Sequence, residues 1–80
     1  MKSSEILLSL GEHIEVFKNS LGVCVNYENA EVKDGMFLIS EFGVGEDFES
    51  ACDDYMNKIR GKKLVFNACS SARREVQVLG

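Results

Sequence analysis

Residues 47–61, DFESACDDYMNKIRG, form the clearest amphipathic pattern of this chain. Their apolar residues recur at spacings of three and four, which places them on one stripe of a helix. The stripe consists of Phe48, Ala51, Cys52, Tyr55, Met56 and Ile59. Asp47 suits the N-cap, and Gly61 suits the left-handed position that follows a helix. We therefore predict a helix from Asp47 to Gly61 that buries this stripe.

A second helical pattern lies at the start of the sequence. Ser3 or Ser4 can cap a helix, and the apolar residues that follow also alternate spacings of three and four. They are Leu7, Leu10, Ile14, Phe17 and Leu21. Gly22 suits the end of such a helix, whereas Gly11 weakens the pattern by about 1 kcal/mol relative to alanine. We expect this helix to end at Gly22.

A hairpin is predicted around Asp34-Gly35, because this dipeptide is typical of two-residue turns between antiparallel strands. The turn would place Val32 opposite Phe37 and Ala30 opposite Ile39. We expect these four residues to face the core. An extended segment, residues 23–27, precedes the hairpin.

A second hairpin follows the strong helix. Residues 64–68 alternate, residues 70–72 make a short loop, and Val76 and Val78 alternate again. Together the elements predict an α+β fold, α-β-β-α-β-β, in which two helices cover a mostly antiparallel sheet of about four strands in two layers. With 80 residues, the chain makes one domain, residues 1–80.

Composition and charge exclude several classes of function. The chain is 45% hydrophobic and 28% charged, which is typical of a globular domain. Its longest apolar runs fall short of the roughly 20 residues of a membrane helix, and acidic residues interrupt any signal-peptide core. We expect a cytoplasmic protein. A net charge of −4 repels phosphate backbones, so nucleic-acid binding is not expected.

No catalytic, metal or cofactor site is predicted. Cys24, Cys52 and Cys69 are odd in number and widely spaced, which suits buried, reduced thiols. The single histidine, His13, leaves too few metal ligands and would have to serve alone as a base for any of these thiols. The segment 43–45, Gly-Val-Gly, precedes a helix as phosphate loops do, but the acidic residues after it oppose an anion. We interpret it as a flexible turn.

Two surfaces are candidates for protein binding. The first is the densest acidic cluster of the chain, which is either a solvated helix face or a surface that meets a basic partner. It comprises Glu46, Asp47, Glu49, Asp53 and Asp54. The second lies on the other face of the predicted hairpin and is too apolar for a fully solvated surface. Its residues, Met36, Leu38 and Phe42, are candidates for a homodimer interface.

A resemblance adds to this interpretation. The stretch Gly45-Glu46-Asp47-Phe48-Glu49-Ser50-Ala51-Cys52-Asp53-Asp54-Tyr55, with Ile59-Arg60-Gly61-Lys62 and Leu64-Val65-Phe66, resembles small uncharacterised proteins of phages and prophages of Gram-positive bacteria. The resemblance spans roughly residues 43–78. It implies an accessory factor that binds a host or phage protein, and some such proteins inhibit bacterial defence. No functional residue is implied.

A fold-level likeness suggests an alternative. A hairpin, a Gly-x-Asp-Phe-Glu-x-Ala helix and a strand also look like part of the HicB-type antitoxin domain. This chain departs from that family in its N-terminal helix and in lacking an appended DNA-binding segment. We therefore predict a non-catalytic, homodimeric protein-binding accessory factor of phage type. The alternative is a HicB-like regulator that binds a small basic toxin.

Overall fold

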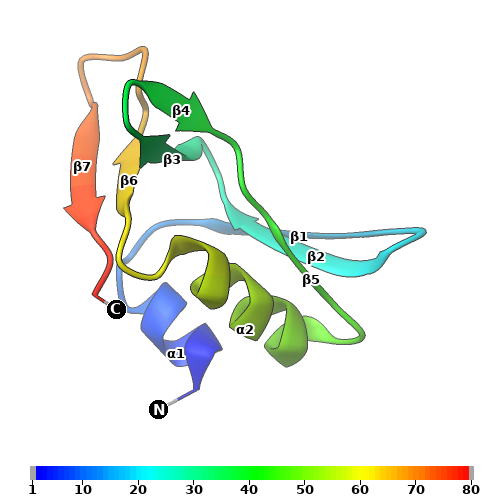
Figure 1. Ribbon diagram of the computed structural model, residues 1–80. Coiled ribbons are helices and arrows are strands. Elements are labelled where there is room, and N and C mark those ends of the chain that lie inside the picture. Colours follow the sequence, from blue (N-terminus) through cyan, green and yellow to red (C-terminus); the bar gives the residue numbers. More distant parts are fainter. Residues whose placement is uncertain (1, 80) are drawn as a thin grey trace.

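The computed structural model describes residues 2–79, which form two helices and seven antiparallel strands in two sheets (Figure 1). The predicted α+β class is confirmed, but the element order and the single sheet are not. Along the chain the elements are α1 (Ser3–Leu8), β1 (Ile14–Asn19), β2 (Gly22–Tyr27), β3 (Ala30–Asp34), β4 (Phe37–Ile39), β5 (Gly43–Gly45), α2 (Phe48–Ile59), β6 (Lys63–Phe66) and β7 (Arg74–Gln77). None of the helices among these residues has the length and apolarity to cross a membrane.

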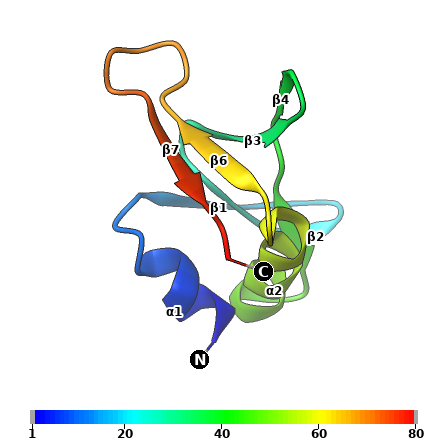
Figure 2. The ribbon, with the colours of Figure 1, turned by 60° about the vertical axis from the view of Figure 1, so that its left-hand side comes forward.

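The strands divide into sheet A, in the order β1-β2-β5, and sheet B, in the order β4-β3-β6-β7. The chain passes from sheet A to sheet B between β2 and β3, where Asn29 takes a positive φ of 58°. It returns between β4 and β5. Both helices lie on the same side of sheet A, with α1 beside α2 (Figure 2). Two linked sheets therefore share one helical layer.

The N-terminal helix is much shorter than predicted. α1 ends at Leu8, and Gly11 takes a φ of 75°, a left-handed conformation that stops a helix. Residues 14–19 then form a strand of the hairpin with β2. The side chain of Asn19 accepts a hydrogen bond from the Leu21 N–H at 2.8 Å and stabilises the turn. The helical interpretation of Ile14, Phe17 and Leu21 is therefore wrong.

The hairpin between β3 and β4 is confirmed, but its register differs from the prediction by two residues. Val32 lies opposite Ile39, and Asp34 lies opposite Phe37, so Gly35 and Met36 form the loop. Gly35 alone has a positive φ there, as a turn with a left-handed first residue requires. A shift of two keeps each residue on its expected face. Phe37 and Ile39 are nevertheless exposed, because β4 extends beyond the helices.

α2 agrees closely with the prediction. Asp47 caps it by accepting a hydrogen bond from the Ser50 N–H at 2.8 Å, and Ser50 Oγ accepts one from the Asp47 N–H at 3.2 Å. Gly61 follows the helix end with a φ of 75°. Phe48 is the exception on the apolar stripe, because its side chain is 37% exposed.

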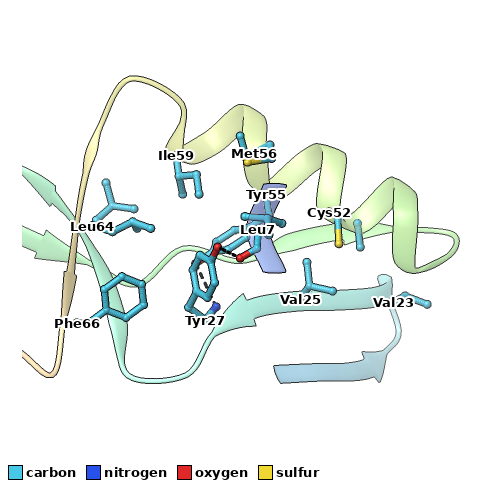
Figure 3. Packing of buried hydrophobic residues seen from close by; sticks show 12 residues of the cluster. Leu7, Val23, Val25, Tyr27, Cys52, Tyr55, Met56, Ile59, Leu64 and Phe66 are labelled. Carbon is cyan, nitrogen blue, oxygen red and sulfur yellow. Dashed lines mark hydrogen bonds between the residues drawn. The ribbon is translucent and has the colours of Figure 1, made fainter. Parts of the chain in front are cut away.

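The core lies where the helices meet the two sheets, and Tyr27 is at its centre (Figure 3). The Tyr27 ring packs edge-on against Phe66, with ring centroids 5.3 Å apart, and its hydroxyl donates a hydrogen bond to the Leu7 carbonyl. The Tyr27 N–H donates to the Tyr55 hydroxyl at 3.2 Å. These contacts join α1, α2 and both sheets through one residue.

β5 replaces the flexible turn that was predicted from the glycines. A Cβ on Gly43 would lie 2.1 Å from the Ala51 carbonyl oxygen, and a Cβ on Gly45 would lie 2.5 Å from the Ala51 N–H nitrogen. Glycine at both positions therefore lets the backbone of β5 lie directly against α2. These residues are structural, and they position α2 on sheet A.

Candidate functional site

A polar hollow of about 530 Å³ opens at the junction of the two sheets. Three connecting segments meet there: the turn before β3, the link from β4 to β5, and the loop from β6 to β7. Its lining residues are Asn26, Tyr27, Asn29, Ala30, Glu31, Ser40, Glu41, Asn67, Ala68, Cys69 and Ser70. The Asn67 N–H donates to the Asn29 carbonyl at 2.9 Å and ties two of the segments together.

Two half-buried carboxylates line this hollow. Glu31 lies in β3, and Glu41 lies in the link that leads to β5. Among residues 2–79, neither carboxylate forms an ion pair, and the nearby Arg73 is engaged by Glu75 at 3.1 Å. Negative charge therefore remains uncompensated in the hollow, where partial burial strengthens its interaction with an incoming cation.

The charge of Glu41 acts on Tyr55, which lies in the core beneath the hollow. Burial raises the pKa of Tyr55, the hydrogen bond from the Tyr27 N–H opposes this rise, and the charge of Glu41 adds to it. Tyr55 therefore stays a neutral phenol. Its hydroxyl is an acceptor within the core and supplies no base to the hollow.

Uncharged polar groups complete the lining. The side chains of Asn29, Ser40 and Asn67 form no hydrogen bond with any other described residue. Asn67, like Asn29, has a positive φ, and asparagine is one of the few residues that tolerate this conformation. The hollow thus presents amide and hydroxyl groups, which can both donate and accept hydrogen bonds, around the two carboxylates, which when ionised only accept them.

The acidic cluster predicted as a partner-binding surface is mostly used within the fold. Asp47 caps α2, and both carboxylate oxygens of Glu49 accept hydrogen bonds from Ser4, one from its N–H at 3.2 Å and one from its hydroxyl at 2.5 Å. Asp54 accepts a hydrogen bond from the Val44 N–H at 2.9 Å. Within this cluster, Glu46 and Asp53 are the two carboxylates that have neither an ion pair nor a side-chain hydrogen bond to the described residues.

Asp54 carries a pH dependence that can be measured. The hydrogen bond from the Val44 N–H, with help from Lys58 at 2.9 Å, lowers the pKa of Asp54 from its ordinary 3.8. Because the folded state has the lower pKa, the stabilisation is complete above pH 3.8 and is lost as the pH falls through the lowered value. Asp54→Asn is expected to cost about 1 kcal/mol at pH 7.

Urea unfolding of the wild type and of Asp54→Asn at pH 7 and near pH 2 checks this expectation. The difference in unfolding free energy should shrink at the acidic pH, because both proteins then carry a neutral side chain at residue 54. An equal difference at the two pH values would show that the ionised carboxylate is not what stabilises the contact.

The three residues predicted for a dimer interface lie at different structural positions. Met36 is in the turn between β3 and β4 and is 97% exposed, and Leu38 lies on the outer face of sheet B. Phe42 lies against α2, with Lys58 Nζ 5.4 Å from its ring centroid. Val65 also lies on the outer face of sheet B, but it is fully buried within the chain. It lies opposite Glu75, which forms an ion pair with Lys63. Self-association through these residues stays a prediction.

The cysteines differ from the prediction in one position, because Cys24 and Cys52 are buried but Cys69 is exposed. Burial, assisted by the charges of Glu49 and Asp53, raises the pKa of Cys52 to about 11. An activated thiolate would need a lowered pKa. Within residues 2–79 no three His, Cys, Asp or Glu side chains converge as a metal site would need.

The chain matches no family model, and no curated protein or solved structure matches it significantly. The hollow itself was not predicted from the sequence. Asn29 and Asn67 could have signalled turns, but only the pairing of β3 with β6 brings these turns together. Glu31 and Glu41 are ten residues apart, with a hairpin between them, and no spacing rule connects them.

Proposed function

We propose that this protein is a non-catalytic protein-binding accessory factor whose polar hollow receives a basic side chain of its partner. One observation carries the proposal: Glu31 and Glu41 line an open hollow, half-buried and without an ion pair among the described residues. Carboxylates in such surroundings favour a cation that brings its own hydrogen bonds.

Arginine fits this hollow better than lysine. A guanidinium group offers five N–H donors in a planar fork, and it pairs with carboxylates through two parallel hydrogen bonds. The oxygens of Asn29, Ser40 and Asn67 can accept the donors that the glutamates leave free. A volume of about 530 Å³ admits the side chain together with some of the backbone that carries it.

The charge of this chain indicates that its partner is a basic protein. A net charge of −4 speeds encounter with a basic protein and disfavours acidic competitors. A host or phage protein with an exposed basic loop would meet this requirement, and so would the small basic toxin of the antitoxin-like alternative. The resemblance to phage and prophage proteins supports an accessory role of this kind.

A charge-reversal experiment tests the proposal. The double variant Glu31→Lys, Glu41→Lys would be compared with Glu46→Lys, Asp53→Lys, which makes the same charge change on α2 instead. Each protein is immobilised, and the proteins retained from a bacterial lysate are identified and ranked by isoelectric point. A basic protein retained by the wild type should be retained by the α2 variant and lost from the hollow variant, with at least a tenfold fall in affinity.

Two results would contradict the proposal. Retention by the hollow variant with loss from the α2 variant would identify the acidic helix face as the binding surface. Equal retention by all three proteins would show that neither acidic surface binds. Circular dichroism melts of each variant confirm that it is folded before its binding is compared.

A further inference from the structure

The two sheets have four edge strands, and three of them have features that disfavour the addition of another strand. At β5 the outward N–H of Val44 donates to Asp54 at 2.9 Å, and Lys58 donates to the Phe42 carbonyl at 2.9 Å. β7 has four residues, and two of them, Arg74 and Glu75, are charged. β4 has only three residues. Side chains and shortness of this kind are how proteins prevent strand addition.

β1 is the open edge. It has six residues, Ile14–Asn19, and its outer side has no strand, helix or loop paired with it among the described residues. The His13 carbonyl accepts a hydrogen bond from the Glu28 N–H at 2.9 Å, so residue 13 points its backbone groups toward β2. Hydrogen bonding alternates along an antiparallel strand. The backbone groups of Ile14, Val16 and Lys18 therefore point outward, without a partner strand.

Apolar side chains accompany this free backbone on both faces of the strand. Val16 is 55% exposed on the face that α2 covers further along the sheet, and Phe17 is 44% exposed on the opposite face. An exposed β-branched residue beside an exposed aromatic residue is typical of a strand that pairs with another strand. Lys18 is the one charged residue among the three that point their backbone outward.

We propose that β1 pairs with β1 of a second copy of this chain, antiparallel and about a two-fold axis at Val16. In such a pair the residue numbers of opposite residues add to a constant, and both lie on the same face. Centring on Val16 places Ile14 opposite Lys18 of the second copy, so all three outward residues are paired. The two three-stranded sheets become one six-stranded sheet.

Backbone pairing and aromatic packing favour this register over its neighbours. The two Phe17 rings lie diagonally across from each other on the face opposite Val16, where aromatic side chains can reach one another, and the two Glu15 side chains form the other diagonal of that face. Centring on Glu15 or on Lys18 would instead place like charges directly opposite. Centring on Phe17 would pair Val16 with Lys18 but leave Ile14 of each copy without an opposite residue in β1. The strand is thus self-complementary at Val16.

Light scattering with size-exclusion chromatography tests the proposal on the full chain. The wild type should elute at twice its 8.9 kDa across the micromolar range. Val16→Pro should be monomeric, because proline removes the outward N–H while the bonds between β1 and β2 stay intact. Met36→Lys, in the exposed turn between β3 and β4, is the control and should remain dimeric.

A cross-linking experiment keeps the proposal falsifiable if the proline variant does not fold. In a Cys69→Ser background, Val16→Cys should form a covalent dimer under mild oxidation, because directly opposite residues of a hydrogen-bonded pair lie within disulfide reach. Gln77→Cys on β7 should not. A monomeric wild type at millimolar concentration would overturn the proposal, and so would a dimer that Met36→Lys disrupts or that Val16→Cys fails to cross-link.

Discussion

Replacing Gly43 with alanine is expected to lower the free energy of unfolding by about 3 kcal/mol or more. The new Cβ would lie 2.1 Å from the Ala51 carbonyl oxygen and 2.6 Å from both the Cβ and the backbone nitrogen of Tyr55. None of these atoms can rotate away, since they belong to the backbone or to the first side-chain atom. α2 would have to move off β5, and the core around Tyr55 would open with it.

Gly61→Ala is the matched control for this prediction. Gly61 has a φ of 75°, and no atom lies within 4 Å of an added Cβ, so only the left-handed backbone is strained. It should cost about 1 kcal/mol. Urea titration at constant pH measures both changes. Similar small losses for the two variants would mean that α2 and β5 are not in close contact.

The same glycines show why part of the fold could not be predicted. Gly43 and Gly45 before a helix are compatible with a turn, a phosphate loop or a strand, and nothing local distinguishes these structures. What decides between them is the distance from β5 to α2, which depends on the whole chain. The helix itself was predictable because its cap, its stripe and its terminal glycine all agree.

The N-terminal third, unlike α2, could not be predicted correctly, because its residues fit both a helical and a strand pattern. Ile14 and Phe17 continue a helical stripe, while Ile14, Val16 and Lys18 fit a strand. Gly11 and the Asn19 turn favour the hairpin, and pairing with β2 stabilises it. The open edge at β1 could not be predicted from the sequence, because its residues were assigned to a helix.

The sequence predicted that the candidate site would be acidic, but it placed the site on α2 instead of in the hollow. An acidic surface was expected on α2, yet Asp47, Glu49 and Asp54 there are hydrogen-bonded within the fold. Carboxylates accept strong hydrogen bonds both from backbone N–H groups within a fold and from basic groups of a partner. The density of acidic residues alone therefore does not distinguish a structural role from a binding role. Glu31 and Glu41 are distinguished only by the tertiary structure, which places them in a hollow without an ion pair to any of residues 2–79.

Replacing Ile59 with alanine is the second large change, and we expect it to cost about 2 to 5 kcal/mol. Ile59 is 1% exposed and packs with Leu7 and Leu64, which belong to α1 and β6. It also lines an apolar hollow of about 190 Å³ between the helices and the C-terminal segment. Truncation would enlarge a space that is already open, and a cavity that cannot collapse costs the most.

Phe48→Ala provides the comparison, because Phe48 was predicted for the same stripe but is 37% exposed at the first turn of α2. Its replacement should cost about 1 kcal/mol or less, since much of the ring already contacts water. Both variants remove apolar side chain from one helix, so their difference isolates burial from helix propensity. Equal losses would mean that α2 is rotated about its axis, with Phe48 turned into the core.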